Sequence, residues 1–227
     1  VTVADLVRNE VFAKVSQDAA EAQHVFANQW EPFVQRFAEV ENGLEKFLFP
    51  YGLLLDRGIT KAELFTRVRS HWTTLGPPAV IIADMSKYVG TFLSVESGRA
   101  DPTLPAAIQQ RLDRLHRIGR PSSIFSFVMR LVDAFKSAVV PEEAVLPILD
   151  LIESFLFRRA LLGIEPTGLH AVFKGLWHEL TGIENPPGVS ADAVKAAIVG
   201  KPTVAWPTDA EFRAGVLTGE LYRRKVV

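Results

Sequence analysis

Histidine is the side chain most often used for proton transfer and metal binding near neutral pH. The sequence holds five, His24, His71, His116, His170 and His178. No two of them stand four residues apart and none belongs to an H-E-x-x-H sequence, so they do not form a helical zinc site. The chain has no Cys, which excludes disulfides, a thiol nucleophile and a cysteine zinc site. We therefore predict no catalytic residue, no metal site and no cofactor in this chain.

Two glycines have the spacing of a phosphate-binding loop. Gly163 and Gly168 match G-x-x-x-x-G, but the next two residues are Leu169 and His170. A phosphate loop needs Lys and then Ser or Thr there, to reach the phosphates and the magnesium ion. The pattern instead favours a helix that ends at Gly163 and a second helix that starts near Gly168.

The densest basic run is RLDRLHRIGR, residues 111 to 120. Arginines recur at every third position, which places the first three in a slowly drifting row on one helix face. They are Arg111, Arg114, Arg117 and Arg120. Such a row could bind DNA phosphates, with affinity that falls as salt rises. The alternative is a charged, solvent-exposed helix face, which is common in globular proteins.

One carboxylate lies within the most apolar segment of the chain. Glu153 is followed by Arg158 and Arg159. A carboxylate in such a helix is costly unless it is paired. We expect Glu153 either to lie on a narrow polar face or to pair with an arginine from another helix. The functional alternative is that Glu153, Arg158 and Arg159 form a buried or interdomain ion pair that acts as a switch.

The helices that must position these groups centre on residues 142 to 180. Apolar residues recur at spacings of three and four in residues 145 to 160, and further leucines cover most of the remaining circumference. A helix that is apolar on nearly all sides is buried on nearly all sides. A second apolar pattern starts after Thr167, which we expect to cap it. These two segments predict a central helical hairpin.

The rest of the chain also has helical patterns, with almost no period-two strand pattern. Helix starts are indicated at Thr2, Asp18, Thr60, Ser122 or Ser123, Ser190 and Thr208, and four of these stand three residues before Asp or Glu. We predict an all-α bundle of about ten helices. It forms a single domain, residues 1–227, with subdomains 1–100 and 101–227 as the alternative.

Composition excludes several function classes. The formal net charge of −1 gives no overall attraction to nucleic acid or to a membrane. No apolar run approaches the ~20 residues that a membrane span needs. The N-terminus lacks the basic and then apolar pattern of a signal peptide. We predict a cytoplasmic protein with no membrane partner.

Several segments, in this order, resemble the helical middle region of the GmrSD-type, modification-dependent (type IV) restriction proteins. The resemblance covers nearly the whole chain. Its best-matched segments are Arg158–Arg159 with the Thr-Gly-Leu turn at 167–169, and the Trp-Pro-Thr-Asp-x-x-Phe segment at 206–212. The start of the chain, VTVADLVRNEVF, and the QWEPF stretch at 29–33 also match.

The resemblance implies a role in phage defence. In that family an N-terminal domain with an Asp-Gly-Gln-Gln-Arg motif handles nucleotide and DNA, and a C-terminal His-Asn-His domain cuts DNA. Neither motif is present here. The resemblance therefore implies a helical connecting domain without catalytic activity of its own, whose parent protein is a DNA endonuclease. Its partners would be DNA, through the parent protein, the two flanking domains and, as a further alternative, a second copy of the protein.

A different function class remains open, a stand-alone helical module that binds a small molecule. Four aromatic residues could line its pocket, although aromatic residues in such patterns are more often core. They are Phe125, Phe155, Trp177 and Trp206. The sequences that flank this chain in its gene would distinguish the two classes.

Overall fold

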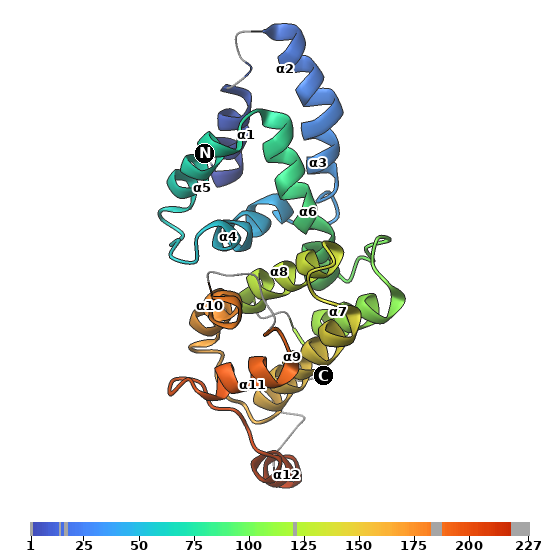
Figure 1. Ribbon diagram of the computed structural model, residues 1–227, viewed down its shortest axis with the longest axis vertical. Coiled ribbons are helices and arrows are strands. Elements are labelled where there is room, and N and C mark those ends of the chain that lie inside the picture. The colour runs from blue at the N-terminus through green and yellow to red at the C-terminus, as the bar shows by residue number, and fades with distance from the viewer. Residues whose placement is uncertain (1, 14, 16–17, 120–121, 183–187, 219–227) are drawn as a thin grey trace. The chain divides into compact units, whose positions relative to one another are not determined.

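The computed structural model describes residues 2–13, 15, 18–119, 122–182 and 188–218. Within these ranges the chain forms helices joined by loops, without a strand (Figure 1). The predicted all-α fold is confirmed. The chain divides into two compact units, Val1–Leu93 and Ser94–Val227. The boundary between the units falls inside a helix, not in the loop near residue 100 where we placed the alternative subdomain limit.

The described part of the first unit contains five α-helices and one π-helical turn, and shares a sixth α-helix with the second unit. Its elements are α1 (Val3–Ala13), α2 (Ala19–Val25), η1 (Phe26–Trp30), α3 (Glu31–Gln35), α4 (Gly43–Leu55) and α5 (Leu64–Leu75). Helix α6 (Pro78–Ser97) then runs across the boundary into the second unit.

Local hydrogen bonds explain where several helices begin. In α1 the Thr2 hydroxyl accepts from the Asp5 amide, and the Asp5 carboxylate accepts from the Thr2 amide. The Asp18 carboxylate accepts from the first amides of α2. The start expected at Thr60 was one turn early, since α5 begins only at Leu64. The Thr60 hydroxyl instead donates to the Glu63 side chain in the turn before the helix. Side-chain capping is thus the reason that helix starts can be predicted from this sequence.

A π-helical turn accommodates Pro32. Proline has no amide hydrogen and its ring crowds the carbonyl of the preceding turn. In η1 the Glu31 amide bonds the Phe26 carbonyl five residues earlier. This wider turn joins α2 directly to α3, with Pro32 in the first turn of α3. The chain therefore continues as helix past this proline.

Aromatic side chains fill the core of the first unit. Consecutive ring contacts, with centroids 5.4–6.4 Å apart, connect Phe12, Phe26, Trp30, Phe33, Phe37, Phe47, Tyr51, Tyr88 and Phe92. Three polar side chains among or next to these rings form a chain of hydrogen bonds. Trp72 Nε1 donates to the Tyr51 hydroxyl at 3.2 Å, which in turn donates to Asp84 at 2.8 Å. Burial, followed by the charge of Asp84, raises the Tyr51 pKa far above its ordinary value.

The described part of the second unit contains six further α-helices and a short 3₁₀ turn. They are α7 (Ala106–Arg117), η2 (Ser122–Ile124), α8 (Phe125–Lys136), α9 (Glu142–Leu161), α10 (Leu169–Thr181), α11 (Ala191–Val199) and α12 (Asp209–Thr218). The residues from Ser122, which we expected to provide a side-chain cap, form η2 instead, and α8 has no side-chain cap. Thr167 is likewise not the cap of α10, because the left-handed Gly168 takes that position at φ 86°.

Helix α9 is the centre of the second unit. It packs against α7, α8, α11 and α12, and Val145, Ile148, Leu149, Ile152 and Phe155 on it have no exposed surface. The expected hairpin of α9 with α10 is corrected in one respect. The main neighbours of α10 are η2, α8 and α11, although Phe155 and Phe173 still meet at 6.5 Å. The segment between α9 and α10 contains Gly163 and Gly168, both at positive φ.

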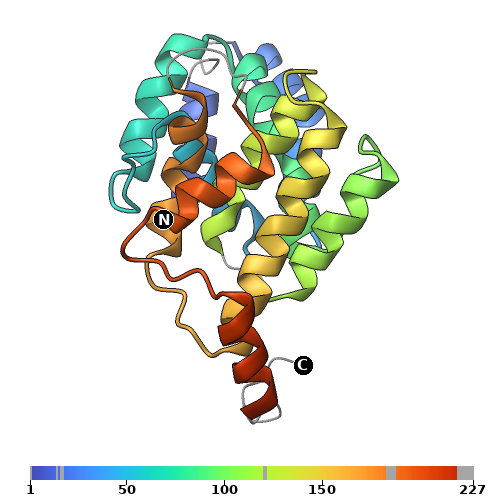
Figure 2. The same cartoon turned by 60° about the horizontal axis from the view of Figure 1, so that its bottom comes forward.

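Helix α12 lies at one end of the second unit, and Figure 2 shows it extending away from the other helices of that unit. It has no buried residue, and Leu217 is 86% exposed. Its principal packing partner is α9. None of the described helices is both long and apolar enough to cross a membrane.

Candidate functional site

The basic row of α7 faces the acidic residues of α9. Arg111 Nε and Nη2 lie 3.1 and 3.0 Å from Asp150 Oδ2. Arg114 bonds the other oxygen of the same carboxylate, and its Nε also lies 3.1 Å from Glu153 Oε2. These side chains are 21–42% exposed. The seam between α7 and α9 is therefore a network of partly buried, charge-assisted contacts.

Of the other two arginines of the row, the structure describes Arg117. Arg117 lies further round the helix, where it is 74% exposed and pairs with Asp113 at 2.7 Å. Arg120 lies outside the described residues. Because Arg111 and Arg114 are held by carboxylates of α9, DNA binding by the row Arg111, Arg114, Arg117 and Arg120 would have to compete with those ion pairs. It stays a prediction.

The structure gives Glu153 a partner from another helix, as one of our alternatives expected. That partner is Arg114 of α7. Arg158 and Arg159 are directed elsewhere, toward the loop before α12. The Glu153 side chain is 25% exposed, so its charge is only partly removed from water. A switch role for Glu153 remains a prediction.

Arg158 and Arg159 fasten the loop that leads to α12. Arg158 Nη1 donates to the Pro207 carbonyl and lies 2.6 Å from Asp209 Oδ1. Hydrogen bonding and the charge of Arg158 lower the Asp209 pKa. Arg159 donates to the carbonyls of Ala205 at 2.7 Å and Glu165 at 2.5 Å. Two adjacent side chains of α9 thus hold two separate loops.

The same loop packs on α9 through its aromatic residue. Trp206 stacks on Phe155, with ring centroids 4.7 Å apart, and Lys195 Nζ lies 5.8 Å from the centroid of the Trp206 ring. The turn at Gly168 approaches the loop closely, because a Cβ there would lie 3.1 Å from Val204. The positive φ of Gly168 and the close approach both favour glycine at this position.

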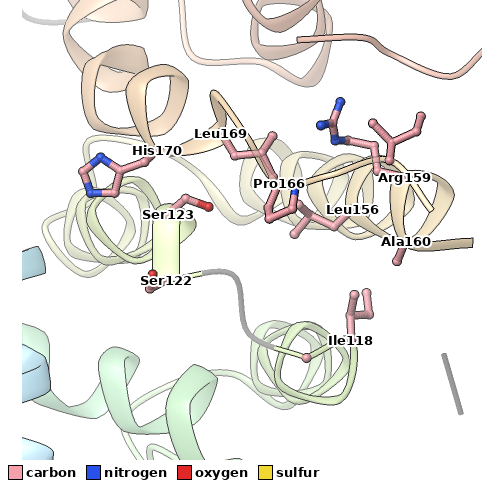
Figure 3. Close-up of a pocket in the computed structure, with 11 residues that line it drawn as sticks. Ile118, Ser122, Ser123, Leu156, Arg159, Ala160, Pro166, Leu169 and His170 are labelled. Atoms are coloured by element: carbon pink, nitrogen blue, oxygen red, sulfur yellow. The ribbon is translucent and has the colours of Figure 1, made fainter. Parts of the chain in front are cut away.

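The contacts of Arg158, Arg159 and Phe155 with the loop that leads to α12 form an anchor for that loop. A pocket of about 520 Å³ opens beside this anchor (Figure 3). Its polar residues are Ser122, Ser123, Arg159 and His170, and its apolar residues are Ile118, Leu156, Ala160, Ile164, Pro166 and Leu169. Figure 3 shows Arg159 on one side and the two serines with His170 on the other. Ser122 and Pro166 at the rim are exposed, whereas Ser123, Leu156 and Arg159 are buried. The pocket therefore has a solvent-facing rim and a mostly apolar, buried floor.

The charge of this pocket is set by Arg159, which is only 4% exposed. Burial lowers the Arg159 pKa from its ordinary value, because water no longer solvates the guanidinium. An arginine stays charged even so. Among the described residues, no carboxylate pairs with it, and its Nε–H has no acceptor. The Ser123 hydroxyl is also buried without a hydrogen-bond partner in that part of the chain.

The sequence did not point to this pocket. The four aromatic residues that we named as pocket residues are part of the packing instead. Phe155 and Phe125 are buried, Trp177 lies against Phe127 and Trp206 against Phe155. The signals in the sequence were Arg159 in an apolar helix and the Gly163 turn, and neither shows which distant residues they meet.

The residues that the structure describes contain no group of three metal-ligating side chains. His116 has a structural contact with the backbone of α6, since its Nδ1 lies 3.1 Å from the Val95 carbonyl. Comparison of the chain with family models, with curated proteins and with solved structures found no match.

Proposed function

We propose that this chain is the helical connecting region of a GmrSD-type, modification-dependent restriction protein. In this role it joins a domain that handles nucleotide and DNA to a His-Asn-His nuclease domain. It contributes no catalytic residue and serves as a scaffold that fixes the relative position of the flanking domains.

One observation carries the proposal. The two segments that best match the family are separated by about 40 residues in sequence, and they contact each other directly. Arg158 and Arg159 bind the carbonyls of Pro207 and Ala205, and the Gly168 turn lies against Val204. A shared sequence pattern is explained when its parts form one structural unit, because each part then requires the other.

The anchor also suggests how the region would work. Arg158 reaches Asp209, the first residue of α12, and its guanidinium lies over the Phe212 ring at 5.1 Å. Phe157 adds a ring contact with Phe212 at 6.5 Å. In the family order, the nuclease domain follows this helix. The arginine pair would therefore set the direction in which that domain is attached to the bundle.

The gene sequence on either side of this chain gives the first test. We expect an Asp-Gly-Gln-Gln-Arg motif upstream and a His-Asn-His motif downstream. A gene that encodes neither would overturn the proposal.

A variant of the full-length protein gives the second test. Arg158→Gln removes the ion pair with Asp209 while keeping a side chain that can bond the Pro207 carbonyl. We expect nucleotide hydrolysis to be retained and cleavage of modified DNA to fall. Arg67→Gln is the matched control, since Arg67 is 53% exposed and pairs with Asp56 and Glu63 in the first unit. Equal cleavage by both variants would contradict a role for the anchor.

A further inference from the structure

We infer that the pocket beside Arg159 binds a small organic anion, with a carboxylate or phosphate head and a short apolar body. This inference concerns a site within the chain and is independent of the proposed scaffold role.

The first reason is the uncompensated charge. A buried guanidinium is normally paired with a carboxylate, because an unpaired charge away from water is costly. Arg159 instead bonds two neutral carbonyls, and among the described residues no carboxylate lies close enough to form an ion pair with it. Its unused Nε–H belongs to a residue that lines the cavity. An anion in that cavity would supply both the missing charge and the missing acceptor.

The second reason is the opposite wall. Ser123 is 9% exposed, and its hydroxyl has no partner among the described residues. A hydroxyl in that position can donate to an anionic oxygen. Two buried polar groups on separate elements, α9 and η2, thus line the same cavity and lack hydrogen-bond partners in the described chain. Buried polar groups are rarely left in this state unless another molecule completes them.

The third reason is the orientation of two helices. The pocket is lined by η2, which continues directly into α8, and by the first residues of α10, Leu169 and His170. The amino end of a helix carries partial positive charge and favours anions. Helix α10 begins without a side-chain cap, although the Leu169 amide already donates to the Pro166 carbonyl. The helical starts at Ser122 and Leu169 therefore add partial positive charge to the side of the pocket opposite Arg159.

The remaining surface restricts the ligand. Ile118, Leu156, Ala160, Ile164, Pro166 and Leu169 supply an apolar lining. A volume of about 520 Å³ lies in the range of small-molecule sites. Among the described lining residues, no Phe, Tyr or Trp is present to stack on a nucleobase. A small aliphatic acid or phosphate monoester fits these features better than a nucleotide does.

Isothermal titration of the 227-residue chain tests this inference with four probes. Hexyl phosphate and hexanoate carry both the head and the body, inorganic phosphate carries only the head, and hexanamide lacks the charge. We expect hexyl phosphate or hexanoate to bind at least about tenfold more tightly than hexanamide, because hydrogen bonds to a charged group are the stronger ones. We expect inorganic phosphate to bind weakly. Equal binding of hexanamide, or no binding of either acid, would overturn the inference.

Two variants locate the binding without disturbing Arg159, which also holds the loop that leads to α12. Ser123→Ala removes an unpartnered hydroxyl and should leave the fold intact while weakening the preferred acid about fivefold or more. Ala160→Leu should fill the pocket and abolish binding. Ser190→Ala, at the start of α11, is the control for Ser123→Ala.

Nuclear magnetic resonance of the arginine Nε–H groups gives an independent reading. One signal, assigned through Arg159→Lys, should shift when the preferred acid is added, because the acid supplies the acceptor that this group lacks in the described chain. Unchanged affinity in both pocket variants would assign the binding elsewhere and refute the site.

Discussion

Trp206 and Phe155 are stacked face to face, with ring centroids 4.7 Å apart and planes inclined by 19°. This contact joins the centre of α9 to a loop about 50 residues later in the chain. Phe155 is fully buried, and Trp206 covers it from the solvent side. The stack therefore closes the core of the second unit at the place where Arg159 also bonds the loop.

Trp206→Ala should destabilise the second unit by removing this stack. We expect the free energy of unfolding to fall by about 2 kcal/mol, less than the ~3–5 kcal/mol for a fully buried aromatic residue, because Trp206 is partly exposed. Trp206→Phe keeps an aromatic ring over Phe155 and should cost much less. Urea unfolding, followed by circular dichroism, measures both. Equal costs for the two variants would show that stacking does not stabilise this loop.

Leu149→Ala should show how central α9 is. Leu149 has no exposed surface, so we expect the free energy of unfolding to fall by about 2–5 kcal/mol. Leu217→Ala is the same substitution at a residue that is 86% exposed, and should change stability by less than about 0.5 kcal/mol. The difference between the two urea midpoints is the measurement. Similar midpoints would mean that α9 is not the core helix.

Asp101 should make stability depend on pH. Burial alone would raise its pKa, but hydrogen bonds from Lys136 at 2.8 Å and from Thr103 lower the pKa below the ordinary 3.8. The ionised form therefore favours the folded state. Its contribution is complete above the unfolded pKa, and disappears as pH falls through the lower pKa of the folded state.

Asp101→Asn should accordingly cost about 1–3 kcal/mol at pH 7 and almost nothing near pH 2. Chemical unfolding at a series of pH values gives the comparison. Lys136→Met removes the cation of the same pair and should flatten the pH dependence in the same window. A cost for Asp101→Asn that stays constant from pH 7 to pH 2 would contradict the assignment.

Features that depend on neighbours in sequence were predictable. The capping residues Asp18 and Ser190 lie at helix starts as expected, and Gly163 has the left-handed backbone expected of a helix stop. In each case the hydrogen bonds or backbone angles involve residues within one turn. The all-α fold and the buried face of α9 follow from the same local periodicity. The expectation that this helix is buried on nearly all sides was wrong, because Pro147 and Phe157 are exposed.

Features that depend on distant neighbours were not predictable. The pairing of Arg111 with Asp150 needs α7 to lie on α9, 39 residues away, and a row of arginines gives no sign of it. The pocket needs Ser123, Arg159 and Leu169 to meet from three elements. Apolar periodicity identifies a buried face, but not which helix covers it. The four aromatic residues that we named for a pocket were therefore chosen by residue type alone, and aromatic residues usually form core.

Substitutions in the α7 row test DNA binding in the full-length protein. If these arginines hold the backbone, replacing Arg111, Arg114, Arg117 and Arg120 with Gln should weaken binding to modified and unmodified DNA alike, since phosphate contacts carry no sequence information. The slope of log affinity against log salt should become shallower by about 0.9 for each duplex phosphate that the variant no longer neutralises. Fluorescence anisotropy at several salt concentrations measures both effects.

Substitutions of the acidic residues in the seam between α7 and α9 should change the DNA affinity in the opposite direction. Asp150→Asn weakens the hold on Arg111 and Arg114, and Glu153→Gln weakens the hold on Arg114 alone. If phosphates compete with these carboxylates, the Asp150→Asn variant should bind DNA more tightly than the wild-type protein. The effect of Glu153→Gln should be smaller, because only one arginine is released. If all the variants bind with the wild-type affinity and salt slope, then these arginines do not contact DNA, and Arg111 and Arg114 serve only to join α7 to α9.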